Sequence, residues 1–131
     1  MSWDLRIIED LHIVKLTISG TVSGQELLDA AAARIDFGKE HDATRFIIDA
    51  RDMDARESTT TAIHEIPTRI YAEKDFNRLC HIAVVTPINP ESRWITQFYE
   101  DICVNRGWRV ETFGDADDAI SWLQRAKPLA E

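Results

Sequence analysis

Two short segments built almost entirely from apolar residues constrain the fold of this chain more than any other feature. They are Phe46-Ile47-Ile48 and Ile82-Ala83-Val84-Val85, and neither contains a polar side chain. Strands of a parallel sheet that helices cover on both faces have continuous apolar runs of this kind. Because a segment with helical spacing separates the two, we expect them to lie side by side in the middle of a helix-covered sheet.

Three further strands are predicted around this pair. Residues 3–8 and 12–18 form a hairpin joined by the polar turn Glu9-Asp10, and the second strand alternates between apolar and polar residues, with His12 on its apolar face. Residues 108–113 alternate in the same way, which places that strand nearer an edge. Alternation with a period of two is typical of half-buried strands.

The helices are predicted from their end signals and apolar stripes. Ser23 and Glu26 form a capping box that begins the first helix, and Gly38 is expected to end it. A second helix covers residues 58–75, Asn89-Pro90 opens a third, and Asp115 caps the fourth. For the third helix we predict an inner face of Trp94, Ile95, Phe98 and Ile102, with Tyr99 off that face. The order ββαβαβαβα predicts one α/β domain over residues 1–131, with a mixed, mostly parallel five-stranded sheet flanked by four helices.

Composition narrows the classes of partner and compartment. The net charge of −8 disfavours nucleic acid, whose binding requires clustered cations. Cys80 and Cys103 have no CxxC spacing, which predicts free thiols and a reducing compartment. The first residues lack the pattern of a signal peptide, and no apolar run reaches the roughly 20 residues that span a bilayer. We therefore expect a cytoplasmic protein.

Several motifs together resemble a known family. They are the opening hairpin with Trp3, the segment Ile18-Ser19-Gly20-Thr21-Val22-Ser23, the two apolar strands with Asp49, and the closing segment from Phe113 to Leu123. In this order they resemble the SpoIIAA-like group of the STAS superfamily, which is related to anti-sigma-factor antagonists and is also compared with CRAL-TRIO lipid-binding domains. The resemblance implies the same five-stranded fold and no catalytic activity. It also implies roles in protein–protein switching, in ligand sensing or in association with lipids.

The residues themselves also argue against an enzyme and against a metal or cofactor. No G-x-S-x-G, P-loop or G-x-G-x-x-G motif occurs, and His64 lacks a second histidine at zinc-binding spacing. The stretch from Asp49 to Thr61 is predicted as an acidic loop at the carboxyl edge of the sheet. It lacks the central glycine and closing glutamate of a calcium loop. We expect no cofactor and no metal.

In STAS switches, a serine or threonine at the start of the helix after this loop accepts a phosphate. Ser58 and Thr59 occupy that position here, but the glycine that follows the family's phosphorylated serine is missing. A phosphate near a helix N-terminus would be stabilised by the helix dipole. The alternative is that Ser58 or a neighbouring threonine only caps the helix.

The second helix contains the feature that most directly suggests a ligand site. Pro67 interrupts the stripe of Ile63, Ile66 and Ile70, so the helix must be kinked or split there. We predict that residues 58–76 form a movable cover over an apolar site, with ligand contacts from Ile63, Ile66, Pro67, Ile70 and Tyr71. The alternative is a static kinked helix that packs on the core.

The leading interpretation is a non-enzymatic domain that binds an apolar small molecule or lipid, with peripheral membrane contact as a variant. The rival is a switch that binds a regulatory protein, phosphorylated at Ser58 or Thr59. A third and weaker interpretation is an enzyme that uses the acidic loop. Alternating edge strands and aromatic residues such as Trp94 and Trp122 are compatible with a homodimer.

Overall fold

The computed structural model describes residues 3–126 and confirms a single mixed sheet with flanking helices. The sheet has the order β1-β2-β3-β4-β5, in which β1 is antiparallel to β2 and all other neighbours are parallel. The elements are, in chain order, β1 (Trp3–Ile8), β2 (Ile13–Thr21), α1 (Gly24–Glu40), β3 (Arg45–Asp54), α2 (Thr60–Glu65), a π-helical turn η1 (Ile66–Ile70), α3 (Tyr71–Glu73), β4 (His81–Val85), α4 (Pro90–Asn105), β5 (Arg109–Phe113) and α5 (Ala116–Arg125). Since α2, η1 and α3 follow one another without a break, they act as one helical segment, and the predicted ββαβαβαβα order holds.

The two apolar strands lie side by side at the centre of the sheet, as predicted. Ile47 pairs with Ala83 and Ile48 with Val84 in the parallel register of β3 and β4. Ile48 and Val84 belong to the larger hydrophobic core, whereas Ile47 and Ala83 belong to the smaller one. Both faces of these strands are therefore buried, which explains their continuous apolar sequence.

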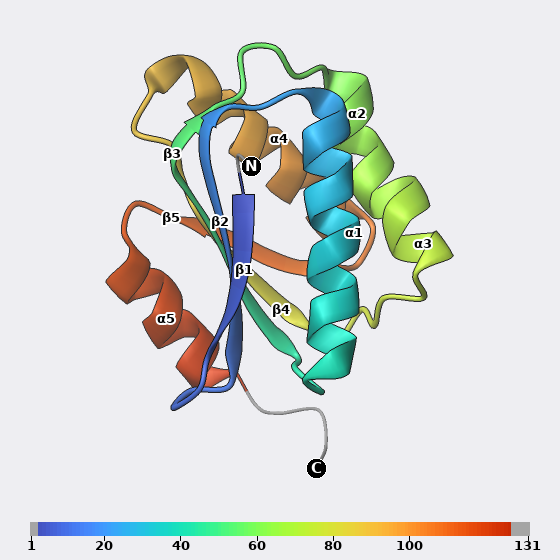
Figure 1. Ribbon diagram of the computed structural model, residues 1–131, viewed down its shortest axis with the longest axis vertical. Helices are drawn as coiled ribbons and strands as arrows, with labels where there is room; N and C mark the ends of the chain where they lie inside the picture. Colours follow the sequence, from blue (N-terminus) through green and yellow to red (C-terminus); the bar gives the residue numbers. More distant parts are fainter. Residues whose placement is uncertain (1–2, 127–131) are drawn as a thin grey trace.

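The helices are distributed unequally over the two faces of the sheet. α5 alone covers one face, where Ala119 and Leu123 pack on β3 and β4. α1 and the α2–η1–α3 segment lie on the other side (Figure 1), together with α4, whose buried residues join the same core. Three successive right-handed crossovers in one direction require this arrangement. The face with three helices holds the candidate site.

Two strand boundaries differ from the prediction. β3 continues through Ala50 to Asp54, so the first part of the predicted acidic loop is a strand that pairs with the end of β2. A register shift between Thr17 and Ser19 accommodates this extension, and Met53 faces the core. His12 lies in the hairpin turn with a φ of 53° and not in β2. The apolar pattern did not predict the end of β3 or the start of β2, because tight turns and bulges depend on local backbone geometry.

The end of α1 also differs. The predicted capping box is present, since Ser23 Oγ accepts from the Glu26 N–H and Glu26 accepts from the Ser23 N–H. Gly38, however, does not end the helix, which continues to Glu40. A Cβ at Gly38 would lie 2.6 Å from the ring of Phe46, so glycine is needed there for the close approach of α1 to β3.

Pro67 interrupts the helical segment, as predicted, and the interruption is a π-helical turn. Proline has no N–H, so the Ile63 carbonyl accepts from Ile66 instead. Thr68 Oγ1 donates to the His64 carbonyl at 2.7 Å, and the Tyr71 N–H donates to the Ile66 carbonyl. These bonds keep the segment continuous while its ladder changes from i→i−4 to i→i−5.

Candidate functional site

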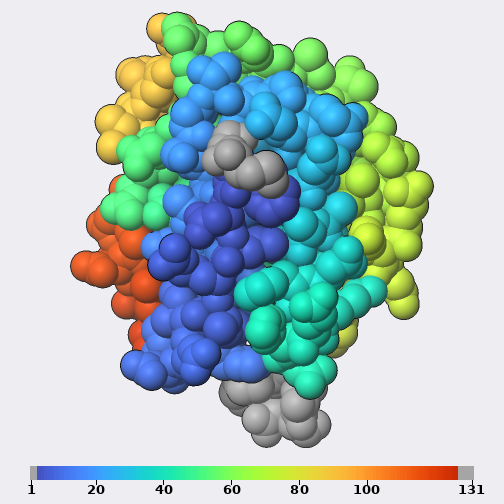
Figure 2. Space-filling model, in the orientation of Figure 1, coloured from blue at the N-terminus to red at the C-terminus, as the bar shows by residue number. Residues whose placement is uncertain are grey.

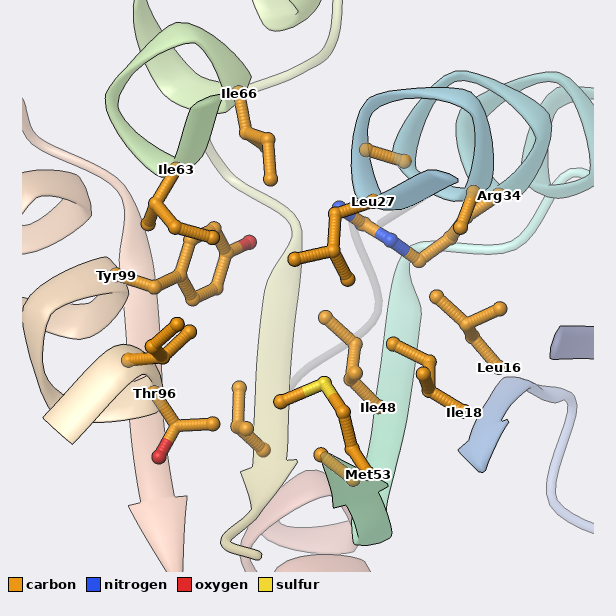
Figure 3. A pocket seen from close by; sticks show the side chains of 15 residues that line it. Leu16, Ile18, Leu27, Arg34, Ile48, Met53, Ile63, Ile66, Thr96 and Tyr99 are labelled. Carbon is orange, nitrogen blue, oxygen red and sulfur yellow. The ribbon is translucent and has the colours of Figure 1, made fainter. Parts of the chain in front are cut away.

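An apolar cavity lies between the sheet and the layer of three helices. It encloses about 60 Å³. Figure 3 shows side chains from the sheet, α1, the α2–η1 segment and α4 converging on it. The lining residues are Leu16, Ile18, Leu27, Ala30, Ala31, Arg34, Ile48, Ala50, Met53, Ile63, Ile66, Val84, Ile95, Thr96 and Tyr99. Only Arg34, Thr96 and Tyr99 carry polar side-chain atoms, so most of the wall is hydrocarbon.

The cavity is small, and the side chains that line it are buried. Every lining residue is buried, and the most accessible of them, Ile48, is 9% exposed. α1 and the α2–η1–α3 segment pack against each other without an opening on the face shown in Figure 2. A Cβ at Gly24 would lie 2.7 Å from Ala62 Cβ, which shows how closely α1 approaches α2. α1 and α2 therefore lie in close contact beside the cavity.

The α2–η1–α3 segment lies outermost over the cavity, and we call it the cover. Its main contacts are with α1 and α4, while α1 and α4 themselves pack on the sheet. At its carboxyl end, Lys74 Nζ forms an ion pair with Asp36 of α1 at 2.9 Å, and the Lys39 ammonium donates to the Lys74 carbonyl. The cover is therefore fastened to α1 by a latch at the surface.

The only charged group in the cavity wall is Arg34. Its side chain reaches from α1 across the cavity, with its nitrogen atoms toward the Tyr99 hydroxyl (Figure 3). Arg34 Nη2 donates to the Tyr71 hydroxyl, and the Tyr71 and Tyr99 hydroxyl groups are hydrogen-bonded to each other. This cluster of Arg34, Tyr71 and Tyr99 connects α1, the cover and α4 at one end of the cavity.

The structure brings together only part of the ligand set predicted for the cover. Ile63 and Ile66 line the cavity. Ile70 is buried in the core but does not line it. Pro67 and Tyr71 line a different cleft, a polar one of about 180 Å³ beside Arg78 and Arg106.

The sequence analysis did not identify Arg34 and Tyr99 as residues of the site, although the position of each on its helix pointed to burial. Arg34 follows Leu27 by seven residues and Ala31 by three, so it falls on the apolar stripe of α1. The predicted inner face of α4 is wrong by about one residue: Tyr99 is buried, whereas Trp94 is exposed. The buried positions Ser92, Ile95, Thr96, Tyr99 and Cys103 define the true face. The prediction misplaced this face of α4 because it was based on the larger apolar residues.

The two candidate phosphoacceptors have different surroundings. Ser58 is buried, and its hydroxyl donates to the Val22 carbonyl at 3.4 Å. Thr59 is exposed and is the N-cap of α2, where its Oγ1 accepts from the Ala62 N–H at 3.2 Å. The expectation of a capping residue here is therefore confirmed, with Thr59 in that role.

Near the carboxyl edge of the sheet, Asp49 is paired with cations. Asp49 accepts from Arg51 Nε at 3.0 Å and Nη2 at 2.8 Å, and Lys15 Nζ lies 3.8 Å away. Burial opposes ionisation of Asp49, but these bonds outweigh it and lower the pKa of the carboxyl group. Residues 3–126 contain no group of three His, Cys, Asp or Glu side chains that could hold a metal ion.

Trp94 and Trp122, which the sequence analysis considered for a homodimer surface, differ in their exposure to solvent. Trp94 is 46% exposed near the start of α4, with Phe98 at a ring distance of 6.3 Å. Trp122 is half-buried and packs against His81 and Phe113, so it fills the seam between α5 and the sheet. No helix among the described residues is long and apolar enough to cross a bilayer.

Fold and site define an α/β domain with an apolar cavity, lined by buried residues, beneath a helical cover. The family model described as SpoIIAA-like matches residues 13–124, and this chain belongs to that family. A similar solved structure is that of an uncharacterised DUF3478-family protein with a SpoIIAA-like fold from Shewanella loihica PV-4. It has a TM-score of 0.54 and 15% identity, and the match covers 92% of this chain and 91% of that one. No curated protein matches the sequence. The family supports a regulatory domain, and the solved structure supports the fold.

Proposed function

We propose that this domain binds an apolar small molecule or lipid in the cavity beneath the α2–η1–α3 cover. The observation that carries the proposal is the cavity itself, an apolar space that separates the cover from the sheet. A well-packed core of this size rarely keeps a space much larger than a water molecule, and apolar cavities bind apolar guests.

Binding requires the cover to move outward. The cavity of about 60 Å³ is much smaller than the ~300–1,000 Å³ of typical ligand pockets. The π-helical turn at Pro67 supplies a place where the helical ladder is already altered, and the ion pair of Lys74 with Asp36 is accessible to water. Both features lower the cost of displacing the cover relative to α1. The resulting function is that of a sensor or carrier whose cover responds to the ligand.

The test is binding of the uncharged fluorescent probe N-phenyl-1-naphthylamine to the purified domain, with native mass spectrometry of the same sample. We expect saturable fluorescence enhancement and a rise in melting temperature with probe concentration. Ala31→Leu adds three carbon atoms to the cavity wall and should abolish the enhancement. Ala33→Leu, on the half-exposed side of the same helix, is the matched control and should bind normally. Equal binding by wild type and Ala31→Leu would show that the probe binds elsewhere.

The alternative function is a protein-binding switch controlled by phosphorylation. The observation in its favour is the exposure of Thr59 at the beginning of the cover. A phosphate on Thr59 would add about two negative charges beside the helix N-terminus. Phosphopeptide mapping of protein isolated from its native cells tests this alternative, which requires phosphate on Thr59.

A further inference from the structure

Arg34 is buried without an anionic partner, which is unusual for an arginine. Its side chain is 1% exposed, and its Nε and Nη1 have no hydrogen-bond partner among residues 3–126. Since Nε carries one hydrogen and Nη1 two, at least three of its five N–H donors have no acceptor. None of the ion pairs formed by the described residues involves Arg34.

The groups around Arg34 do not compensate its charge. Burial raises the pKa of Tyr71 and Tyr99, so both are neutral phenols at pH 7. Burial also raises the pKa of Cys103 to about 12 and of Cys80 to about 11, which keeps both thiols protonated. The rings of Phe46, Tyr71 and Phe76 have their centroids 5.4–5.7 Å from the guanidinium carbon. Their faces attract the cation but carry no net negative charge. One end of the cavity therefore carries one positive charge without a counter-ion among the described residues.

Asp49, the other buried charged residue among those described, is paired with cations. Its carboxylate is 7% exposed, accepts hydrogen bonds from Arg51 and forms an ion pair with Lys15 at 3.8 Å. Buried charges are normally paired in this way because desolvation of an isolated ion is costly. Arg34 departs from that rule at a position where it borders empty apolar space.

We propose that the ligand is a single-chain carboxylic acid, such as a fatty acid, whose carboxylate binds the Arg34 guanidinium. This inference rests on the proposed function and specifies the chemistry of its ligand. A carboxylate supplies one negative charge and two oxygen acceptors, which match one guanidinium with unfilled donors and the nearby Tyr99 hydroxyl. A doubly charged phosphomonoester fits less well, because no second cation lines the cavity. The hydrocarbon chain lies against the isoleucines of the sheet, the cover and α4.

Figure 3 shows how the cavity divides between these two parts of the ligand. Arg34 and Tyr99 direct their polar atoms toward one another, whereas Ile18, Ile48 and Met53 offer only carbon and sulfur. Thr96 is the remaining polar residue, and its hydroxyl already donates to the Arg93 carbonyl at 3.0 Å. The acidic headgroup thus has one place to bind, at the cluster of Arg34, Tyr71 and Tyr99.

The experiment compares dodecanoate with dodecanol, below micellar concentrations, as competitors of N-phenyl-1-naphthylamine on the full chain. The two have the same chain length and differ in charge. We expect wild type to bind dodecanoate about tenfold more tightly than dodecanol. Arg34→Met should lose that preference while it still binds the neutral probe and dodecanol. Arg69→Met removes the same charge from the exposed side of the cover and should keep the preference.

The outcomes separate this inference from the proposed function. Neutral probe and dodecanol binding without a preference for dodecanoate overturns the carboxylate inference and leaves the apolar site standing. A preference that survives in Arg34→Met also overturns it, because another cation then holds the carboxylate. Absence of any binding overturns both. If Arg34→Met does not fold, the wild-type preference measured from pH 8 down to pH 4 decides: protonation of dodecanoate should abolish it, and a constant preference would contradict the inference.

Discussion

Arg34 of α1 donates a hydrogen bond to the hydroxyl of Tyr71, the first residue of α3. This bond joins the fixed helix layer to the cover inside the protein, whereas the ion pair of Asp36 with Lys74 joins the same two elements at the surface. The first contact is buried and the second is exposed to solvent. In the proposed function, the buried contact lies where the ligand binds, and the exposed contact resists movement of the cover.

Removal of the Tyr71 hydroxyl should destabilise the ligand-free domain. Tyr71→Phe removes the hydroxyl oxygen that accepts from Arg34 Nη2. A buried charged donor without an acceptor lowers the free energy of unfolding by about 1–3 kcal/mol. We expect the free energy of unfolding in urea to fall by that amount. In the double variant Arg34→Met/Tyr71→Phe, much of the loss should be recovered, because no buried charge remains. If the free-energy changes of the two single substitutions simply add up in the double variant, Arg34 and Tyr71 are not energetically coupled.

Loss of the surface latch should speed ligand entry. Lys74→Ala removes the ion pair with Asp36, whose net contribution is about 0–1 kcal/mol. We expect the association rate of N-phenyl-1-naphthylamine to rise about two- to fivefold, in line with that energy, with little change in the melting temperature. Glu73→Ala is the control, because Glu73 pairs with Arg69 within the cover itself. Equal rates in wild type and Lys74→Ala would show that another contact limits opening.

Stability should fall in acid partly through Asp49. Burial raises the pKa of this group, but the hydrogen bonds from Arg51 lower it more, so its folded pKa lies below the unfolded value of about 3.9. A lowered folded pKa stabilises the fold above the unfolded pKa, and that contribution disappears as pH falls through the folded pKa. Asp49→Asn should therefore destabilise the protein by ~1–2 kcal/mol at pH 7. The difference from wild type should shrink steadily from pH 5 to pH 2 in urea titrations. A difference that is independent of pH would contradict the assignment.

Charge at the two hydroxyl residues before α2 should have opposite consequences. Ser58→Asp places a carboxylate in a buried position and should cost about 3 kcal/mol or more of stability. Thr59→Asp should be nearly neutral, because aspartate is also a favourable N-cap. Thermal unfolding of both variants tests this, and equal stabilities would show that Ser58 becomes accessible. Binding lost only in Ser58→Asp would therefore report unfolding rather than phosphorylation.

Much of the fold follows from patterns in the sequence that act locally. The apolar runs around Ile47 and Val84 require burial on both faces, and that requirement places β3 and β4 in the centre of the sheet. Capping by Ser23, Asn89 and Asp115 occurs as predicted, because a capping bond involves residues only a few positions apart. Pro67 likewise breaks its helical ladder wherever the helix lies.

The site depends instead on which distant residues meet. The seven-residue spacing from Leu27 placed Arg34 on the buried stripe of α1. Nothing near it in sequence shows that its neighbours are neutral phenols, a thiol and phenyl rings from β3, the cover, the loop after α3 and α4. The packing rotation of α4 decided that Tyr99 rather than Trp94 faces inward. An amphipathic pattern gives the direction of a helix face only to within about one residue, since the true rotation is set by packing against the whole layer. The sequence therefore determined the sheet and its cover, and only the tertiary structure placed an unpaired positive charge beside an apolar cavity.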